Sequence, residues 1–223
     1  MTFSIVARDA SGAFGAAICS SSPAVAARCV HLADGIGGVN SQNITDPRLG
    51  ATLLERLGRG ESAEQALHAV TSATANIAYR QVLVVDAAGG VAAHSGERAL
   101  GVFGHVLGTG AVAGGNMLAD AAIPQLMVDR FSQVEGDLEV RLLAAAQAAM
   151  EAGGEAGPVH SAGLSVVRDA GWRVTDLRVD WTDGDPIGEL ARLVELWLPQ
   201  RDDYVTRGID PSAAPSYGVP GDE

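Results

Sequence analysis

Residues 2–22 read TFSIVARDASGAFGAAICSSS and define how the chain begins. The run TFSIVAR places apolar side chains at alternate positions from Phe3 onward, which is the period of a β-strand. The run DASG that follows consists of turn-forming residues, and AFGAAIC supplies a second apolar stretch. The segment therefore predicts a β-hairpin whose first strand starts at Thr2.

Beyond the hairpin, blocks of strands alternate with pairs of helices. Helix starts are indicated by capping sequences at Asp46-Pro47, at Ser62 with Gln65, at Asp137 and at Asp185-Pro186, and a further helix follows Asn116. The predicted strands cover residues 35–42, 79–86, 90–94, 162–168 and 172–179, with short extended pieces near Val102 and over residues 109–113. The last helix is predicted to end at Trp197.

Helices that come in pairs differ from the single crossovers of doubly wound and barrel α/β folds. We therefore predict an α+β fold in which two antiparallel sheets pack together as a four-layer αββα sandwich, flanked by helix pairs. Residues 1–198 are expected to form a single αββα domain. Residues 199–223 are polar and proline-rich, so we expect an irregular C-terminal tail.

The charge of the chain excludes several classes of function. All 15 basic residues are arginine, against 27 acidic residues, and the formal net charge is −12. Without a basic run, we expect no nucleic-acid partner and no anionic-membrane partner. The absence of lysine excludes Schiff-base chemistry, pyridoxal phosphate anchoring and a Walker-type phosphate loop. We expect neither a cofactor nor a metal.

The compartment is predicted from cysteine usage and hydropathy. Cys19 and Cys29 are too few for a disulfide framework, which indicates a reducing environment. Charged residues interrupt the first apolar run, and nowhere do eighteen apolar residues follow one another. We therefore expect a cytoplasmic protein with no membrane-spanning segment.

Thr2 is the residue with the clearest catalytic potential. Removal of Met1 would leave a strand that begins with a free threonine, because aminopeptidases remove methionine before a small side chain. An α-amine has a pKa of about 7.7–8, so it can accept the proton of the adjacent hydroxyl while that hydroxyl attacks a carbonyl. The alternative is that Thr2 is an ordinary strand residue.

Two groups of polar residues could complete such a site. Ser20, Ser21 and Ser22 return beside Thr2 at the end of the hairpin, where they could hydrogen-bond its amine or hydroxyl or form an ordinary ST-turn. A polar run follows the predicted strand 35–42. Its amide side chains could donate to an oxyanion or orient a substrate, or could satisfy the loop's own backbone; they belong to Asn40, Gln42 and Asn43.

Arg80 and Asn116 are the remaining candidates for binding substrate. Arg80 opens an otherwise apolar strand and could clamp a carboxylate, or form an ordinary surface ion pair. Asn116 follows two glycines at a helix start, where backbone N–H groups suit an anionic group. The His-Ser pairs at residues 94–95 and 160–161 do not predict a triad, since adjacent strand residues point to opposite faces.

The chain resembles the bacterial family catalogued as domain of unknown function 1028, grouped with the N-terminal nucleophile (Ntn) hydrolases. The matching segments run in order along nearly the whole chain: TFSIVARD, GIGGVNSQNITDPRLG, RLGRGESAEQAL, RQVLVVDAAGGVAAHSGE, GGNML, HSAGLSVVR and DLRVDW. The resemblance implies an Ntn-hydrolase-like αββα sandwich and hydrolysis of an amide-like C–N bond. The proteasome-type hydrolases use a lysine near the nucleophile, and this chain has none to offer.

Together these observations predict a hydrolase of a small amide, ureido or cyclic-imide-like molecule, with Thr2 as the nucleophile. The alternative is a non-catalytic protein on the same fold that binds a small molecule or serves assembly. Apolar small residues and the motif Gly208-Ile209-Asp210-Pro211 beyond the last helix indicate that the tail packs on another subunit. We therefore expect a homodimer or a larger symmetric homo-oligomer.

Overall fold

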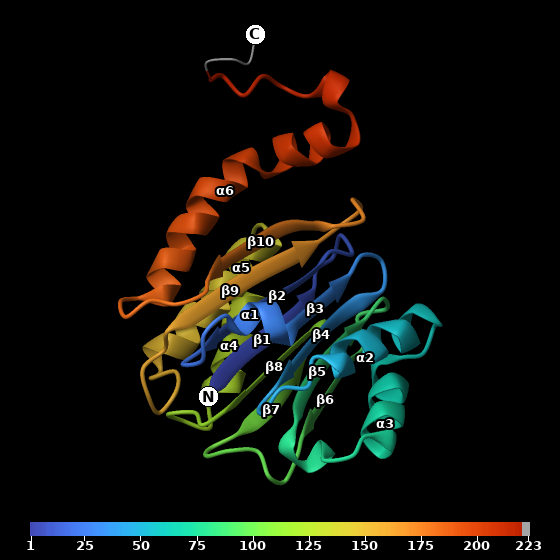
Figure 1. Ribbon diagram of the computed structural model, residues 1–223, viewed down its shortest axis with the longest axis vertical. Coiled ribbons are helices and arrows are strands. Elements are labelled where there is room, and N and C mark those ends of the chain that lie inside the picture. Colours follow the sequence, from blue (N-terminus) through green and yellow to red (C-terminus); the bar gives the residue numbers. More distant parts are fainter. Residues whose placement is uncertain (220–223) are drawn as a thin grey trace.

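The computed structural model of the chain describes residues 1–219, and in this range the strands form two antiparallel sheets (Figure 1). The strands are β1 (Thr2–Arg8), β2 (Phe14–Ser20), β3 (Val30–Ala33), β4 (Gly37–Gln42), β5 (Gln81–Asp86), β6 (Val91–Ser95), β7 (Gly104–Gly108), β8 (Ala111–Asn116), β9 (Ser161–Val167) and β10 (Arg173–Val179). The helices are α1 (Val25–Cys29), α2 (Arg48–Gly58), α3 (Ala63–Ala73), α4 (Ile123–Gln133), α5 (Leu138–Glu151) and α6 (Pro186–Ile209), with 3₁₀ turns η1 (Ile77–Tyr79) and η2 (Pro211–Ala213).

The predicted N-terminal hairpin is confirmed. β1 pairs with β2 in antiparallel register, from Phe3 opposite Cys19 to Arg8 opposite Phe14. The Asp9 carboxylate accepts a backbone N–H from Ser11 at 2.9 Å, which closes the turn. β1 lies inside a six-stranded sheet of order β10-β9-β2-β1-β8-β7, so both of its edges are paired. The other sheet has the order β3-β4-β5-β6.

Alternation along β1 separates two apolar cores. Phe3 and Ile5 point toward α4 and α5, which pack on one face of the six-stranded sheet. Val6 points the other way, into an apolar cluster shared with Leu83 and Val85 of the second sheet. A third cluster lies between that second sheet and the helices α2 and α3, seen on its outer face in Figure 1. The period-two pattern thus places neighbouring residues of β1 in different layers.

Residues 25–33 depart from the prediction, which placed no element there. They form α1 and β3, and β4 begins at Gly37 rather than at residue 35. A helix of five residues is too short to show a 3.6-residue period, and its start at Ala24 has a left-handed backbone (φ 51°) that no side-chain cap announces. α1 contacts β2, β9 and β4, so it fills space at one end of the sheets.

Helix starts were predicted with mixed success. The capping box at Ser62 and Gln65 is confirmed, since Gln65 N–H donates to Ser62 Oγ at 3.3 Å and Ser62 N–H donates to Gln65 Oε1 at 3.0 Å. α5 does begin after Asp137, but the Asp137 side chain makes no capping hydrogen bond. Its carboxylate lies 3.7 Å from Arg201 Nη2 instead, because α6 brings that arginine close.

The expectation of an irregular tail from residue 199 is wrong for its first part. α6 continues through Pro199 to Ile209, and η2 follows. Pro199 lies on the exposed side of the helix, where water can satisfy the carbonyl that loses its N–H partner. Residues 220–223 of the predicted tail lie outside the described residues.

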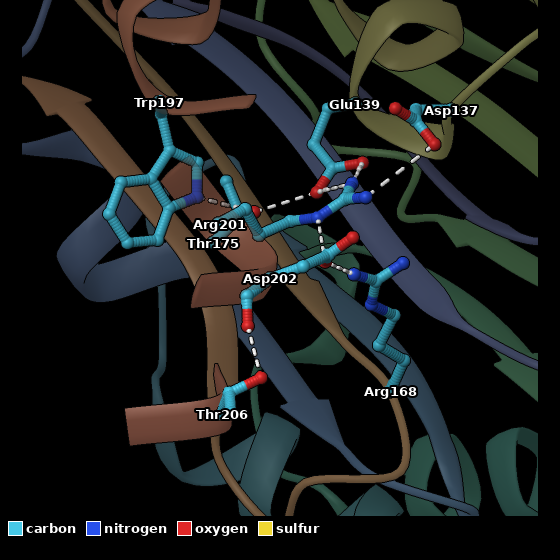
Figure 2. A network of polar contacts seen from close by, with 8 residues as sticks. All are labelled: Asp137, Glu139, Arg168, Thr175, Trp197, Arg201, Asp202 and Thr206. Carbon is cyan, nitrogen blue, oxygen red and sulfur yellow. Dashed lines mark hydrogen bonds and ion pairs between the residues drawn. The ribbon is translucent and has the colours of Figure 1, made fainter. Parts of the chain in front are cut away.

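A buried ion pair anchors α6 to the rest of the molecule (Figure 2). Arg201 Nη1 donates to both carboxylate oxygens of Glu139 on α5 at 3.1 Å, and the two side chains are 6% and 2% exposed. Thr175 of β10 donates to Glu139 Oε1 at 2.7 Å, and Trp197 Nε1 donates to Thr175 Oγ1 at 3.0 Å. One carboxylate thus joins α5, β10 and α6, which explains how a proline-containing helix keeps its path.

Within residues 1–219, no helix has the length and apolar character needed to cross a bilayer.

Candidate functional site

A cavity of about 300 Å³ opens where β1 begins and β2 ends. Its walls come from β1, β2 and β8 of the six-stranded sheet, from α1, and from the loops after β2, β4 and β6. The lining residues are Met1, Thr2, Ser20, Ser22, Val25, Arg28, Cys29, Asn43, Ile44, Thr45, Pro47, Leu100 and Asn116. Five of the predicted site residues therefore meet in one hollow: Thr2, Ser20, Ser22, Asn43 and Asn116. A larger groove of about 700 Å³ between β10 and α6 contains none of the predicted residues.

Thr2 and Ser20 bring two hydroxyl groups together in this cavity. Their oxygens lie 3.3 Å apart, and both side chains are buried. Each hydroxyl also donates to the carbonyl oxygen of Met1, and the donor–acceptor distance is 2.5 Å for Thr2. The first peptide carbonyl of the chain therefore occupies the donors that surround Thr2.

The serines after β2 have separate roles. Ser22 N–H donates to Ser20 Oγ at 3.0 Å, so the ST-turn that the sequence left open is present. Ser161 Oγ donates to Ser22 O at 2.6 Å and fixes the same loop to β9. The backbone N–H of Ser21 points away from the cavity and donates to Glu155 Oε1 at 3.0 Å. Ser20 is thus the serine that contacts Thr2.

A polar seam between the sheets supports Asn116. Thr2 faces Asn116 in the pairing of β1 with β8, and Asn116 Nδ2 donates to Gln81 Oε1 at 3.3 Å. Gln42 was predicted to bind substrate, but it lies between the two sheets and does not line the cavity. Its amide donates to Gln81 Oε1 at 2.8 Å and accepts from Ser4 Oγ at 2.6 Å, so the seam consumes its hydrogen-bonding capacity.

Asn43 lines the cavity, but its amide serves the backbone. Nδ2 donates to Tyr79 O at 2.6 Å, and Oδ1 accepts from Leu100 N–H at 3.1 Å. Asn43 and Ile44 both have left-handed backbones, with φ of 55° and 52°. For a β-branched residue such a conformation costs about 1–3 kcal/mol. Ile44 of this strained turn and Leu100 of the loop after β6, 53% and 43% exposed, form an apolar rim.

Two other predicted residues lie away from the cavity. Asn40 is fully buried between the sheets, where its Nδ2 donates to Ile5 O at 3.4 Å. Its position within β4 turns the side chain toward β1 rather than toward the loop. Arg80 follows η1 at the start of β5 and does not line the cavity. Neither residue is placed to touch a ligand beside Thr2.

Arg28 lines the cavity and was not predicted from the sequence. It lies on the exposed face of α1, and its Nη1 donates to the carbonyls of Pro23 and Ala24, the latter at 3.3 Å. In the part of the chain that the structure describes, Arg28 forms no ion pair, and no carboxylate lines this cavity. Because α1 itself was missed, no pattern could have indicated Arg28.

Glu155 is the second residue that the sequence did not reveal. It lies in the loop between α5 and β9 and is only 3% exposed. Burial raises the pKa of its carboxyl to about 7, although the N-terminal amino group, the Ser21 N–H and His160 act in the opposite direction. Among the described residues its Oε2 has no hydrogen-bond partner. A lone glutamate in a glycine-rich loop carries no recognisable motif.

Burial disfavours the reactive thiolate form of both cysteines. Burial raises the pKa of the Cys19 thiol well above its ordinary value, and the nearby Glu155 raises it further. Burial also raises the pKa of Cys29, a cavity-lining residue whose Sγ lies 3.3 Å from Thr45 Oγ1. Since the thiolate is the reactive form, hydroxyl groups remain the candidate nucleophiles here.

Comparison with known proteins identifies a family of unknown function and two similar solved structures. The family model described as "Family of unknown function (DUF1028)" matches residues 2–190. The crystal structure of protein SPO2555 from Silicibacter pomeroyi, described as a match to the same family model, is similar with a TM-score of 0.81 and 32% identity, over 87% of this chain and 88% of that one. Anbu (ancestral beta-subunit) from Yersinia bercovieri matches with a TM-score of 0.40 and 10% identity, over 88% of this chain and 97% of that one. No curated protein matches the chain.

Proposed function

The chain belongs to the DUF1028 family, and we propose that it is a cytoplasmic hydrolase of a small amide, ureido or cyclic-imide-like molecule, with Thr2 as its nucleophile. The observation that carries the proposal is the position of the Thr2 hydroxyl. It lies in a cavity, 3.3 Å from Ser20 Oγ, on the second residue of the chain. Removal of Met1 would place an α-amine on the same residue.

The reaction then follows the chemistry of an N-terminal nucleophile. The neutral α-amine of Thr2 takes the hydroxyl proton while Oγ1 bonds to the substrate carbonyl carbon. Collapse of the tetrahedral intermediate breaks the C–N bond, and the departing nitrogen takes that proton. Water then attacks the ester on Thr2, the α-amine again accepts a proton, and the acid leaves with the hydroxyl regenerated.

Loss of Met1 also frees the donors that its carbonyl occupies. In the chain with Met1 in place, the hydroxyls of Thr2 and Ser20 both donate to that oxygen. Once the carbonyl is gone, Ser20 Oγ is available to the Thr2 hydroxyl or amine. Ser22 N–H holds Ser20 in position through a 3.0 Å hydrogen bond. Such fixed donors need little reorganisation when charge develops in the transition state.

The architecture supports the same proposal. We assign the two sheets and their helices to the four-layer αββα sandwich of the Ntn hydrolases, because three apolar clusters separate helices, sheet, sheet and helices in that order. The first strand of that sandwich carries the nucleophile. No lysine is available near Thr2, since the sequence contains none.

The cavity limits the substrate to a small molecule. Its volume of about 300 Å³ is at the lower end of the range of roughly 300–1,000 Å³ for small-molecule sites. The rim offers apolar contacts at Ile44 and Leu100, and Arg28 supplies a positive charge. A small amide with an apolar part and an anionic group suits these walls.

The absence of lysine favours one other candidate, a protein that binds the same small molecule without hydrolysing it. Native, untagged protein should show an intact mass without Met1 and should turn over at least one member of a library of amides, ureides and cyclic imides. A blocked N-terminus should abolish hydrolysis and leave binding detectable. Full retention of Met1 in active protein would exclude the mechanism, and binding without turnover would favour the second candidate.

A further inference from the structure

Glu155 lies across the start of β1, at Thr2. It is between the segments that follow the two neighbouring strands, β2 and β8. On one side, Ser21, the residue after β2, donates its backbone N–H to Glu155 Oε1 at 3.0 Å. On the other side, Leu118, just beyond β8, forms an isolated antiparallel bridge with Glu155. Since β2 and β8 flank β1, these contacts place the carboxyl near the N-terminal end of β1, the strand that begins with Thr2.

The second carboxyl oxygen has no partner in the described residues. Glu155 is 3% exposed, and its Oε2 accepts no hydrogen bond. A buried acceptor without a donor costs about 1–3 kcal/mol, and more when it is charged. A donor placed beside Oε2 would remove this cost and stabilise the charged form of the carboxyl.

Met1 lies beside the loop that carries Glu155. Its side chain packs beside Gly157, where an added Cβ would lie 3.1 Å from Met1 Cε. The terminal amino group of Met1 already acts on Glu155 through its positive charge. Removal of Met1 moves that charged group by one residue, to the nitrogen of Thr2, which lies between the ends of β2 and β8.

We propose that Glu155 binds the α-ammonium group of Thr2 after removal of Met1, with Oε2 accepting one of its N–H bonds. The ammonium site concerns the processed chain itself, whereas its catalytic meaning rests on the proposed function. Glu155 is then a positioning residue, because it acts on the α-amine and not on the substrate.

The pair can also supply the neutral amine that the reaction needs. Transfer of one proton from the ammonium nitrogen to Oε2 converts an ion pair into a neutral amine and a carboxylic acid, with no proton lost to water. Burial raises the pKa of Glu155 to about 7, close to the ordinary α-amine value of about 7.7–8, and the attraction within the ion pair adds to the cost of the transfer. The other titratable groups that face Glu155 are His160 and the Cys19 thiol.

The absence of lysine makes the test direct, since the α-amine is the single aliphatic primary amine of the chain. Processed protein is acylated with acetic anhydride across a range of pH, and intact mass gives the rate at each pH. The pH at which the acylation rate is half of its maximum, here called the midpoint, reports the pKa of the α-amine. A bound carboxylate stabilises the ammonium form, so the midpoint of the native protein should lie above that of the same chain unfolded in urea. Glu155→Gln should lower the midpoint, which raises the unprotonated fraction at pH 7 by up to about tenfold per unit.

Asp183→Asn is the matched control. It removes the same charge from a carboxylate 3.5 Å from His160 Nδ1, but Asp183 does not contact the start of β1. Its midpoint should equal that of the parent, and Glu155→Asp should restore part of the shift. An unchanged midpoint in folded Glu155→Gln would overturn the proposal. If that variant does not fold, a native midpoint at or below the unfolded value would do so.

The labelling result does not depend on turnover. A shifted midpoint in a protein that hydrolyses nothing would keep the ammonium site and overturn the proposed function. Turnover with an unshifted midpoint would keep the function and overturn the role of Glu155.

Discussion

The hydroxyl oxygens of Thr2 and Ser20 lie 3.3 Å apart, although eighteen residues separate them in the chain. The pairing of β1 with β2 creates this contact, because the first strand begins where the second one ends. The contact places a potential nucleophile beside a hydroxyl that the loop backbone holds in position.

Thr2→Ala should lower the rate of hydrolysis by at least ~10³-fold, the range seen when a catalytic nucleophile is removed. The variant keeps the α-amine and the removal of Met1, so only the attacking hydroxyl is lost. Thr2→Ser should retain substantial activity, and Thr2→Val tests the hydroxyl with nearly unchanged volume. Steady-state kinetics on the substrate found by the library screen measure the effect. Parent-like activity of Thr2→Ala would reduce Thr2 to an ordinary strand residue.

Glu155 should make stability depend on pH in a chain that keeps Met1. Its pKa is raised from 4.5 to about 7 in the fold, mainly by burial. As pH rises from 4.5 to 7, the unfolded state loses the proton first, so this group progressively destabilises the native state. Glu155→Gln removes the effect, and its stability relative to the parent should therefore increase over this window. Urea unfolding of protein made with methionine aminopeptidase inhibited measures it; a difference independent of pH would contradict the assignment.

Arg201→Met should lower the free energy of unfolding by about 3–5 kcal/mol, because it leaves the Glu139 carboxylate buried without its counter-ion. The double variant with Glu139→Gln should recover part of that loss. Arg168→Met is the control in the same network, since Arg168 is 32% exposed and pairs with Asp202. An exposed pair contributes about 0–1 kcal/mol. Equal losses in the two arginine variants would show that the buried pair has no special role.

Arg28→Gln should weaken recognition of an anionic substrate. Hydrogen bonds to charged groups contribute about 1.5–3 kcal/mol, which corresponds to roughly tenfold or more in kcat/KM. The loss should affect an amide that carries a carboxylate and spare its uncharged counterpart, because Arg28 is the side-chain cation that lines the cavity. Kinetics on matched acid and amide pairs measure the ratio. An equal loss of kcat/KM for both members of a pair would show that Arg28 shapes the cavity but does not recognise the negative charge of the substrate.

Truncation after Thr206 should reduce the molecular mass of the assembly in solution. We expect a homodimer or larger homo-oligomer in which the C-terminal region packs on a neighbour. The outer part of α6 exposes Leu196, Tyr204 and Ile209 by 66%, 42% and 62%, and in Figure 1 its last turns extend beyond the sheets. Light scattering measures the mass of both chains. The same assembly in the truncated chain would show that these residues are not needed for it.

Local signals predicted the parts of the fold that depend on local contacts. The hairpin, the capping box of α3 and the cap of α6, where Asp185 accepts N–H bonds from Ile187 and Gly188, each involve residues within a few positions of one another. Asp137 could not be assigned in this way. It has the residue type of a cap, but its carboxylate lies near Arg201, 64 positions later in the chain.

The candidate site follows the same rule. Thr2 and Ser20 meet through a hairpin, so the sequence could pair them. Glu155 contacts Ser21 and Leu118, beside the start of β1, only because β9 and β8 lie on either side of the hairpin. The order of strands in a sheet does not follow from their order in the chain. Gln42 and Asn40 were predicted to bind substrate because their amide side chains can donate and accept hydrogen bonds. The structure uses them to satisfy buried groups between two sheets.

The strand order has a consequence for timing. β1 is made first, but its second neighbour consists of residues 111–116, and β2 waits for residues 161–167. At about 5–20 residues per second, a ribosome needs roughly ten seconds to reach β8. During that interval the start of the chain has no sheet to enter, and an aminopeptidase can reach it. In a chain that keeps Met1, the first carbonyl accepts hydrogen bonds from both Thr2 and Ser20 once the hairpin has joined its sheet, so the folded state itself competes with removal of Met1.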